Sequence, residues 1–195
     1  MRTPHDIKRV AVLGAGLMGH GIALELAAHR RLVCLHDVSE QLLDKAIAHA
    51  RVGLKALHQA GLISFDEIEA SISRISTSLD LSETVEGTDL VIEAVSENLE
   101  LKHSLFDKVD RIAPAHAVLV SNTSTFLPSA LAAATQRPLQ FAGVHYYNPP
   151  HLLPGVEIIK GPETSDATVQ LLTGFYQMIG KRPALIYREI QGFIG

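Results

Sequence analysis

Residues 10–26 read VAVLGAGLMGHGIALEL. A short apolar run breaks at three glycines, Gly14, Gly16 and Gly19, and a helical pattern of apolar residues follows at once. A strand, a glycine-rich turn and a helix start in this order are typical of a dinucleotide-binding unit. The first glycine allows the tight turn, the second lets the backbone approach a pyrophosphate, and the third lets the helix pack against the strand. We therefore expect the phosphates to lie on the unpaired N–H groups of the helix N-terminus, with Leu17 and Met18 among the contacts.

The same unit needs an acid about 20 residues further on, at the end of the second strand, to bind a ribose hydroxyl. Asp37 follows the run LVCLH at 32–36 and occupies that place. Because a carboxylate repels a 2′-phosphate, this residue favours NAD over NADP as the cofactor. A glycine motif alone can also be an ordinary turn, but here both strands, the helix and the acid accompany it.

Length and composition set limits on the class of protein. The 195 residues are 47% hydrophobic with a mean hydropathy of +0.18, which is typical of a globular domain with a buried core. The net charge of −4 argues against a nucleic-acid partner. No apolar run approaches the roughly 20 residues of a membrane span, and the first residues lack a secretion-signal pattern. We expect a soluble, cytoplasmic protein.

The single cysteine and the ten histidines predict neither a disulfide nor a metal site. Cys34 lies in the predicted second strand, where an inert core thiol is expected. The histidines show no recognisable ligand spacing, so no metal is expected.

Strand and helix patterns alternate along the chain, which predicts an α/β fold with a doubly wound, mostly parallel sheet of the Rossmann type. After the second strand, Ser39 can cap a helix that runs to about Ala60. A capping box, SFDE at 64–67, then opens a shorter helix, so a helical hairpin at about 40–73 is inserted after the second strand. Further strands are expected at 75–78, 89–95, 118–120, 141–147, 156–159 and 184–187, and further helices at 99–112, after Pro128 and at 165–179. Residues 1–190 are expected to form this one domain.

Polar residues at the carboxyl ends of strands are the first site candidates, because ligands of open α/β sheets lie there. Asn122 and Ser124 follow the strand at 118–120 and could bind a substrate oxygen or the nicotinamide carboxamide, or form an ordinary turn or helix cap. His145, near the end of its strand, can accept a proton at neutral pH. Glu157 interrupts an apolar strand twelve residues later and could orient that imidazole. The pair could equally be a hydrogen-bonded strand histidine and an acid on an exposed edge.

Taken together, several segments resemble the L-3-hydroxyacyl-CoA dehydrogenase family, and specifically its N-terminal NAD-binding domain. The matching segments are GAGLMGHGIA with Asp37, VIEAVSENLELK, SNTS, GVHYYNPPHLLPGVEII and REIQGFIG, in the family's order over nearly the whole chain. The resemblance implies that His145 is the general base, that Glu157 orients it, and that Ser124 lies near the substrate hydroxyl. It also implies that Glu97 and Lys102 lie beside the nicotinamide ribose, where position alone predicts a solvated helix start. The full cofactor-binding set then comprises Gly14, Gly16, Leu17, Met18, Gly19, Asp37, Glu97, Lys102, Asn122, Ser124 and Asn148.

The reaction implied by the resemblance is the reversible oxidation of the 3-hydroxyl of an L-3-hydroxyacyl-CoA to a ketone in fatty acid metabolism, with NAD as the hydride acceptor. In the family, an asparagine and then a helical domain that usually forms a dimer follow the GFI motif. This chain stops at Gly195, so residues 191–195 are expected to be the start of that domain. We expect this length of chain to bind NAD but to be inactive alone, and the full-length protein to be a homodimer.

Two features leave the substrate open. In family members that act on acyl-CoA, a serine and a lysine of the hairpin's first helix help to hold the CoA, whereas here Gly53 is near the serine's place and Lys55 is the nearby cation. The segment NPP at 148–150 resembles the branch of lambda-crystallin and L-gulonate 3-dehydrogenase, whose substrates carry no CoA. A free 3-hydroxy acid such as L-gulonate or 3-hydroxybutyrate is therefore an alternative substrate. A non-catalytic NAD-binding sensor or structural module is an alternative of another class.

Overall fold

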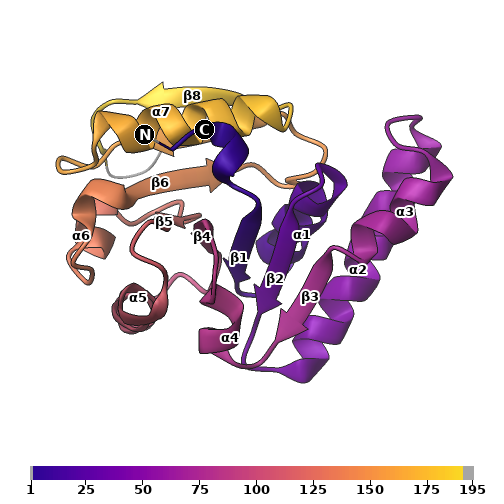
Figure 1. Ribbon diagram of the computed structural model, residues 1–195, viewed down its shortest axis with the longest axis horizontal. Helices are drawn as coiled ribbons and strands as arrows, with labels where there is room; N and C mark the ends of the chain where they lie inside the picture. The colour runs from indigo at the N-terminus through magenta and orange to yellow at the C-terminus, as the bar shows by residue number, and fades with distance from the viewer. Residues whose placement is uncertain (1, 191–195) are drawn as a thin grey trace.

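The computed structural model describes residues 2–190, and within them eight strands form one sheet in the order β3-β2-β1-β4-β5-β6-β7-β8 (Figure 1). The strands are β1 (Arg9–Leu13), β2 (Leu32–His36), β3 (Ile75–Ser78), β4 (Leu90–Glu93), β5 (Val118–Ser121), β6 (Phe141–Tyr146), β7 (Gly155–Ile159) and β8 (Arg182–Ile186). The helices are α1 (Leu17–Ala28), α2 (Glu40–Gln59), α3 (Phe65–Ile72), α4 (Leu81–Val85), α5 (Leu99–Ile112), α6 (Pro128–Ala132) and α7 (Asp166–Met178), with short 3₁₀ turns at η1 (Pro4–Asp6) and η2 (Pro138–Gln140). The chain crosses to either side of β1, which confirms the predicted doubly wound α/β fold.

All neighbouring strands are parallel except β6 and β7, which pair antiparallel. The residues 147–154 join these two strands. A parallel crossover needs a dozen or more residues, so this short connection forces the chain to turn back beside β6. The prediction of a mostly parallel sheet is therefore confirmed, with one reversal at β7.

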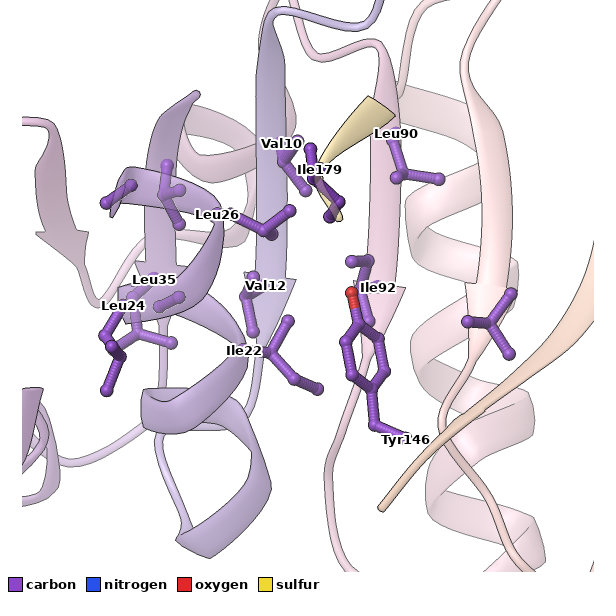
Figure 2. Close-up of a cluster of buried hydrophobic side chains, with 14 of the residues drawn as sticks. Val10, Val12, Ile22, Leu24, Leu26, Leu35, Leu90, Ile92, Tyr146 and Ile179 are labelled. Atoms are coloured by element: carbon purple, nitrogen blue, oxygen red, sulfur yellow. The ribbon is translucent and has the colours of Figure 1, made fainter. Parts of the chain in front are cut away.

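Helices cover both faces of the sheet, and each face has its own hydrophobic core. On one face, Val10 and Val12 of β1 pack with Ile22 of α1 and with residues of α2, α3 and α7 (Figure 2). On the other face, Ala11 and Leu13 of the same strand pack with residues of α4, α5 and α6. Because both faces are buried, the central strands are apolar throughout instead of alternating.

The α2–α3 hairpin lies between β2 and β3 in the chain, as predicted. Ser39 caps α2 by accepting a hydrogen bond from the N–H of Leu42 at 3.4 Å. The predicted capping box at the start of α3 is wrong, because the side chain of Ser64 makes no capping bond. The carboxylate of Glu67 instead forms an ion pair with Arg74 at 2.6 Å, which ties α3 to the start of β3. The domain boundary at 190 stays a prediction, and residues 191–195 lie outside the described residues.

Two other expectations need correction. Cys34 is half-buried, not in the core, and the five-residue helix α4 packs beside its strand. That helix was not predicted from the sequence, although Asp80 caps it by accepting from the N–H groups of Ser82 and Glu83. The central strand is also shorter than the predicted range 89–95, because Asp89 and residues 94–95 lie outside β4. No helix within residues 2–190 is both long and apolar enough to cross a membrane.

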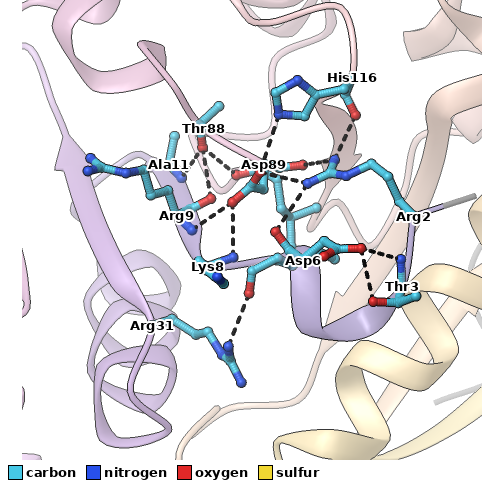
Figure 3. A network of polar contacts seen from close by, with 12 residues as sticks. Arg2, Thr3, Asp6, Lys8, Arg9, Ala11, Arg31, Thr88, Asp89 and His116 are labelled. Atoms are coloured by element: carbon cyan, nitrogen blue, oxygen red, sulfur yellow. Dashed lines mark hydrogen bonds and ion pairs between the residues drawn. The ribbon is translucent and has the colours of Figure 1, made fainter.

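Asp89 ties three segments together at the amino ends of the central strands (Figure 3). Its carboxylate accepts from the backbone N–H groups of Lys8 and Arg9 at 2.9 and 3.0 Å, and it forms an ion pair with Arg2 at 2.6 Å. His116 reaches the same carboxylate at 3.2 Å. Although burial acts in the opposite direction, these donors lower the pKa of Asp89. The network lies at the sheet edge remote from the strand ends that carry the candidate residues, so we interpret it as structural.

A buried ion pair joins α1 to the chain just before β8. Glu25 and Lys181 approach to 2.7 Å with almost no exposed side-chain surface. The ammonium of Lys181 also donates to the carbonyl oxygens of Pro150 and, at 2.6 Å, Leu153. The second carboxylate oxygen of Glu25 has no hydrogen-bond partner among the described residues. Burial raises the pKa of Glu25 to about 7, with Lys181 acting in the opposite direction.

This pair predicts a pH dependence of stability. With a pKa of 4.5 in the unfolded chain and about 7 in the folded one, Glu25 holds a proton in the native state between these values that the unfolded state has lost. Its contribution to the free energy of unfolding is present below pH 4.5 and falls by about 3 kcal/mol as the pH rises to 7. Urea unfolding at pH 5 and pH 7.5 should show this fall in the parent and a smaller one in Glu25→Gln. An equal fall in the free energy of unfolding in the parent and in Glu25→Gln would contradict this prediction.

Candidate active site

The glycine turn packs so closely against its neighbours that two of its positions exclude a side chain. Gly14 has a φ of +105°, and a Cβ there would lie 2.6 Å from the carbonyl oxygen of Ala94. A Cβ on Gly19 would lie 1.7 Å from the carbonyl oxygen of Gly14. Both glycines therefore hold α1 against the ends of β1 and β4, as the motif predicts.

Gly16 differs, because a Cβ on it would meet nothing within 4 Å. It caps the N-terminus of α1 without any side-chain capping bond, and the next side chain, Leu17, is 66% exposed. The first N–H groups of a helix have no intrahelical acceptor and carry the positive end of the helix dipole. This open backbone surface fits a dinucleotide pyrophosphate, which Gly16, Leu17 and Met18 would hold.

Asp37 lies beside that surface at the end of β2. One carboxylate oxygen accepts from the N–H of Ala15 at 2.9 Å and the other from the N–H of Ser39 at 3.2 Å. Each oxygen keeps acceptor capacity for the hydroxyl donors of a ribose. The position and the chemistry of this acid both fit NAD.

His145 and Glu157 face each other directly across β6 and β7. The Nδ1 atom of His145 lies 2.8 Å from Oε2 of Glu157, and the carboxylate side chain is only 4% exposed. Directly paired residues of antiparallel strands share a face of the sheet. With Nδ1–H donated to the carboxylate, Nε2 is the basic atom of a neutral imidazole. The pair can therefore take up a proton and stabilise the imidazolium that results.

A cleft of about 310 Å³ opens beside His145. It is lined by Met18, Ala94, Val95, Glu97, Asn122, Ser124, His145, Tyr146 and Asn148. Six predicted site residues thus come together here, namely Met18, Glu97, Asn122, Ser124, His145 and Asn148. Glu157 lies behind the imidazole, outside this lining. The cleft continues from the glycine turn through Met18, which belongs to α1.

Glu97 fixes the loop that follows β5. Its carboxylate accepts from the backbone N–H of Ser124 at 2.9 Å and from the hydroxyl of Thr123 at 2.8 Å. The side-chain oxygen of Asn122 accepts from the N–H of Tyr146 at 2.9 Å, which joins this loop to β6. Sequence analysis did not identify Thr123. Both contacts hold polar side chains at one wall of the cleft.

Lys102 lies beneath the cleft and does not line it. Its ammonium is 2.6 Å from the buried Glu93 and 3.4 Å from Glu97. Burial raises the pKa of Glu93, with Lys102 acting in the opposite direction. That Lys102 contacts a ribose directly stays a prediction. In this structure its ammonium contacts the carboxylate of Glu97 from beneath the cleft. Glu93 was missed, although an acid inside a predicted apolar strand is the same signal that identified Glu157.

Comparison with known proteins agrees with this geometry. The sequence profile described as "3-hydroxyacyl-CoA dehydrogenase, NAD binding domain" matches residues 9–190. The chain belongs to this family. NAD is accordingly its cofactor, and the turn at 14–19 and Asp37 fit that cofactor.

Individual relatives are similar over most of this chain. The mitochondrial hydroxyacyl-coenzyme A dehydrogenase of Rattus norvegicus is 40% identical over 193 residues, covering 96% of this chain and 61% of the relative. The crystal structure of (S)-3-hydroxybutyryl-CoA dehydrogenase from Ralstonia eutropha has a TM-score of 0.92 at 32% identity, covering 97% of this chain and 66% of that one. A diketoreductase structure, described as acting on dicarbonyl compounds, has a TM-score of 0.91 at 31% identity. The match covers 100% of this chain and 68% of the diketoreductase chain. The chain thus spans 61% of the length of the rat relative.

Gly16→Ala should separate cofactor binding from folding. The added methyl group meets no protein atom, so we expect the free energy of unfolding to change by less than about 1 kcal/mol. It occupies the surface that fits the pyrophosphate, so the affinity for NADH should fall by about tenfold or more. Fluorescence titration with NADH and urea unfolding measure the two effects.

The matched comparison is Gly19→Ala, which should lose the native fold because its methyl group overlaps the carbonyl of Gly14. Parental NADH affinity in Gly16→Ala would contradict the placement of the pyrophosphate.

Proposed function

We propose that this protein catalyses the reversible NAD-dependent oxidation of the 3-hydroxyl of an L-3-hydroxyacyl-CoA to the 3-ketoacyl-CoA, as a cytoplasmic homodimer in fatty acid metabolism. The observation that carries the proposal is the 2.8 Å contact between His145 and the buried Glu157 at the wall of the cleft. A base held by a carboxylate is suited to removing the proton of an alcohol, and an NAD-binding sensor has no need of one.

In this mechanism the residues of the chain move one proton. When bound, NAD supplies the acceptor for the hydride that leaves the carbinol carbon. Nε2 of His145 takes the hydroxyl proton as the C–H bond breaks, and Glu157 stabilises the imidazolium through Nδ1. Because Glu157 is shielded from water, its charge acts on the ring more strongly than it would in solution. In the reverse direction the imidazolium returns the proton to the forming alcohol.

The other residues of the cleft would position the reactants. Ser124 lines the cleft together with His145 and would donate a hydrogen bond to the substrate oxygen. Asn122, Asn148 and Glu97 line the same cleft and would contact the nicotinamide end of the cofactor. Holding both reactants in one geometry lowers the entropic part of the barrier.

His145→Gln should abolish turnover and leave NADH binding nearly intact. Glutamine keeps a polar side chain of similar reach but cannot accept the proton, so kcat should fall by about a thousandfold. Steady-state kinetics of the full chain and NADH titration measure the two properties. His5→Gln, an exposed histidine of η1, is the matched control.

Equal activity of His145→Gln and the parent would refute the assignment of the base. A parent protein that binds NADH and turns over no 3-hydroxy compound would favour the non-catalytic sensor.

A free 3-hydroxy acid is the second candidate substrate, and two observations favour it. A Cβ on Gly53 would lie 2.8 Å from the end of the Leu24 side chain and 3.3 Å from His151, so a serine that holds CoA would fit there only if Leu24 shifted. The diketoreductase, a protein similar over the whole of this chain, is described as acting on dicarbonyl compounds.

Comparing substrates on the full chain decides between the two. We expect kcat/KM for 3-hydroxybutyryl-CoA to exceed that for free 3-hydroxybutyrate and for L-gulonate by at least about a hundredfold, because the CoA moiety adds binding energy. Initial rates of NADH formation measure it, with Lys55→Met testing the nearby cation. A preference for either free acid would overturn the acyl-CoA assignment and leave the His145 chemistry unchanged.

A further inference from the structure

Tyr147 extends the face of the sheet that carries the catalytic pair. The ladder between β6 and β7 pairs His145 with Glu157 and Tyr146 with Val156, and Tyr147 follows at the next position opposite Gly155. Successive side chains of a strand alternate between faces, so positions 145 and 147 share one face. A Cβ on Gly155 would lie 3.3 and 3.4 Å from two ring carbons of Tyr147. The ring therefore lies across the backbone of β7, in space that a glycine leaves.

The same ring packs against the base. The ring centroids of His145 and Tyr147 are 5.3 Å apart, and the planes are tilted by 61°. This contact restricts rotation of the imidazole about its side-chain bonds. Tyr147 does not line the cleft, so it is placed to act on the base and not on the substrate.

Glu157 lies close enough to Tyr147 for its charge to act on the phenol. Burial raises the pKa of Tyr147, and the charge of Glu157 raises this pKa further. Glu157 is two residues beyond Gly155, on the face over which the ring lies. One carboxylate oxygen of Glu157 contacts His145, and a carboxylate has acceptor sites for further donors.

We propose that Tyr147 is a positioning residue of the catalytic pair, whose hydroxyl donates to Glu157 while its ring holds His145 in place. The inference rests on the proposed function and deepens it. Two donors, Nδ1 of His145 and the hydroxyl of Tyr147, fix the carboxylate where a single donor would let it rotate. The phenol also disperses part of the carboxylate charge, so that Glu157 stabilises the imidazolium without holding its proton too firmly.

The titratable groups around the pair are few among the described residues. Glu157 and Tyr147 contact His145 from β7 and β6, and Glu97 lies across the cleft. From β8, the residue paired with Glu157 is Ala184, which carries no charge, and the residue paired with Gly155 is Arg182, a cation on the same face that the substitution of Tyr147 leaves in place. A change in the pH profile after substitution of Tyr147 therefore reports on the Glu157–His145 pair.

Tyr147→Phe in the full chain tests the proposal, because it keeps the ring and removes the hydroxyl. We expect kcat to fall by about tenfold, as for a lost hydrogen bond to a charged group, with KM for NAD within about twofold of the parent. The acid limb of the kcat/KM profile should move to higher pH. Without the hydrogen bond from the Tyr147 hydroxyl, Glu157 keeps more of its negative charge and stabilises the imidazolium more. Tyr176→Phe, which removes a buried hydroxyl from α7, is the matched control and should change neither kcat nor the profile.

Different results would overturn the role of Tyr147 and the proposed function. If Tyr147→Phe matches Tyr176→Phe in kcat and in pH profile, the positioning role is wrong. A lower kcat with an unmoved acid limb would also overturn it, because it would reduce Tyr147 to packing. If the parent shows no turnover, or if His145→Gln retains it, the proposed function itself fails.

Discussion

The reversal of the chain between β6 and β7 brings a carboxylate to a base. Residues 147–154 are too few for a crossover, so β7 runs back along β6 and its Glu157 lies opposite His145. A carboxylate buried inside an apolar strand would be costly without a partner, and the imidazole supplies that partner at 2.8 Å. The same register places both side chains on one face, beside a cleft that reaches the glycine turn. A slip by one residue would turn Glu157 to the opposite face and remove the pair.

Three glutamates are buried among the described residues, and the partner of each indicates whether its role is structural or catalytic. Glu25 is paired with Lys181 and Glu93 with Lys102, and each of these side chains is at most 5% exposed. Each of these two pairs joins elements of the fold: the first joins α1 to the chain before β8, and the second joins β4 to α5. Glu157 is paired with a histidine, the side chain that serves most often as a general base, and that histidine lines the cleft with other candidate site residues. Among the three buried glutamates of the described residues, Glu157 is the one with a histidine as its partner, and we place the candidate site there.

Sequence alone predicted the elements whose signals are local. The glycine turn, Asp37 and the bounds of α5 at Leu99–Ile112 follow from conformational and periodic constraints within a few residues. His145 and Glu157 were identified as candidates because each is a titratable group in an apolar strand. Their contact depends on strand direction, which the length of the 147–154 connection could have indicated. The roles of His145 as general base and of Glu157 as the acid that orients it came from the resemblance to a known family.

Other features depend on packing that no local pattern records. The capping box at Ser64 fails because Arg74, brought in by β3, competes for Glu67. Lys102 is drawn under the cleft by Glu93, which a helix-start position cannot reveal. The place of Tyr147 depends on the empty space above Gly155 on the neighbouring strand. In each case the decisive partner is distant in sequence or on another strand.

The central claim is that His145, steered by Glu157, faces the reacting carbon beside the nicotinamide. A crystal structure of the full chain with NAD and an unreactive analogue of the 3-hydroxyacyl substrate tests it most directly. We predict that the analogue's 3-oxygen lies within about 3 Å of Nε2 of His145, with the nicotinamide ring in the cleft between Met18 and Asn122. An analogue bound with its 3-oxygen beyond hydrogen-bond reach of His145, and oriented by other side chains, would contradict the account.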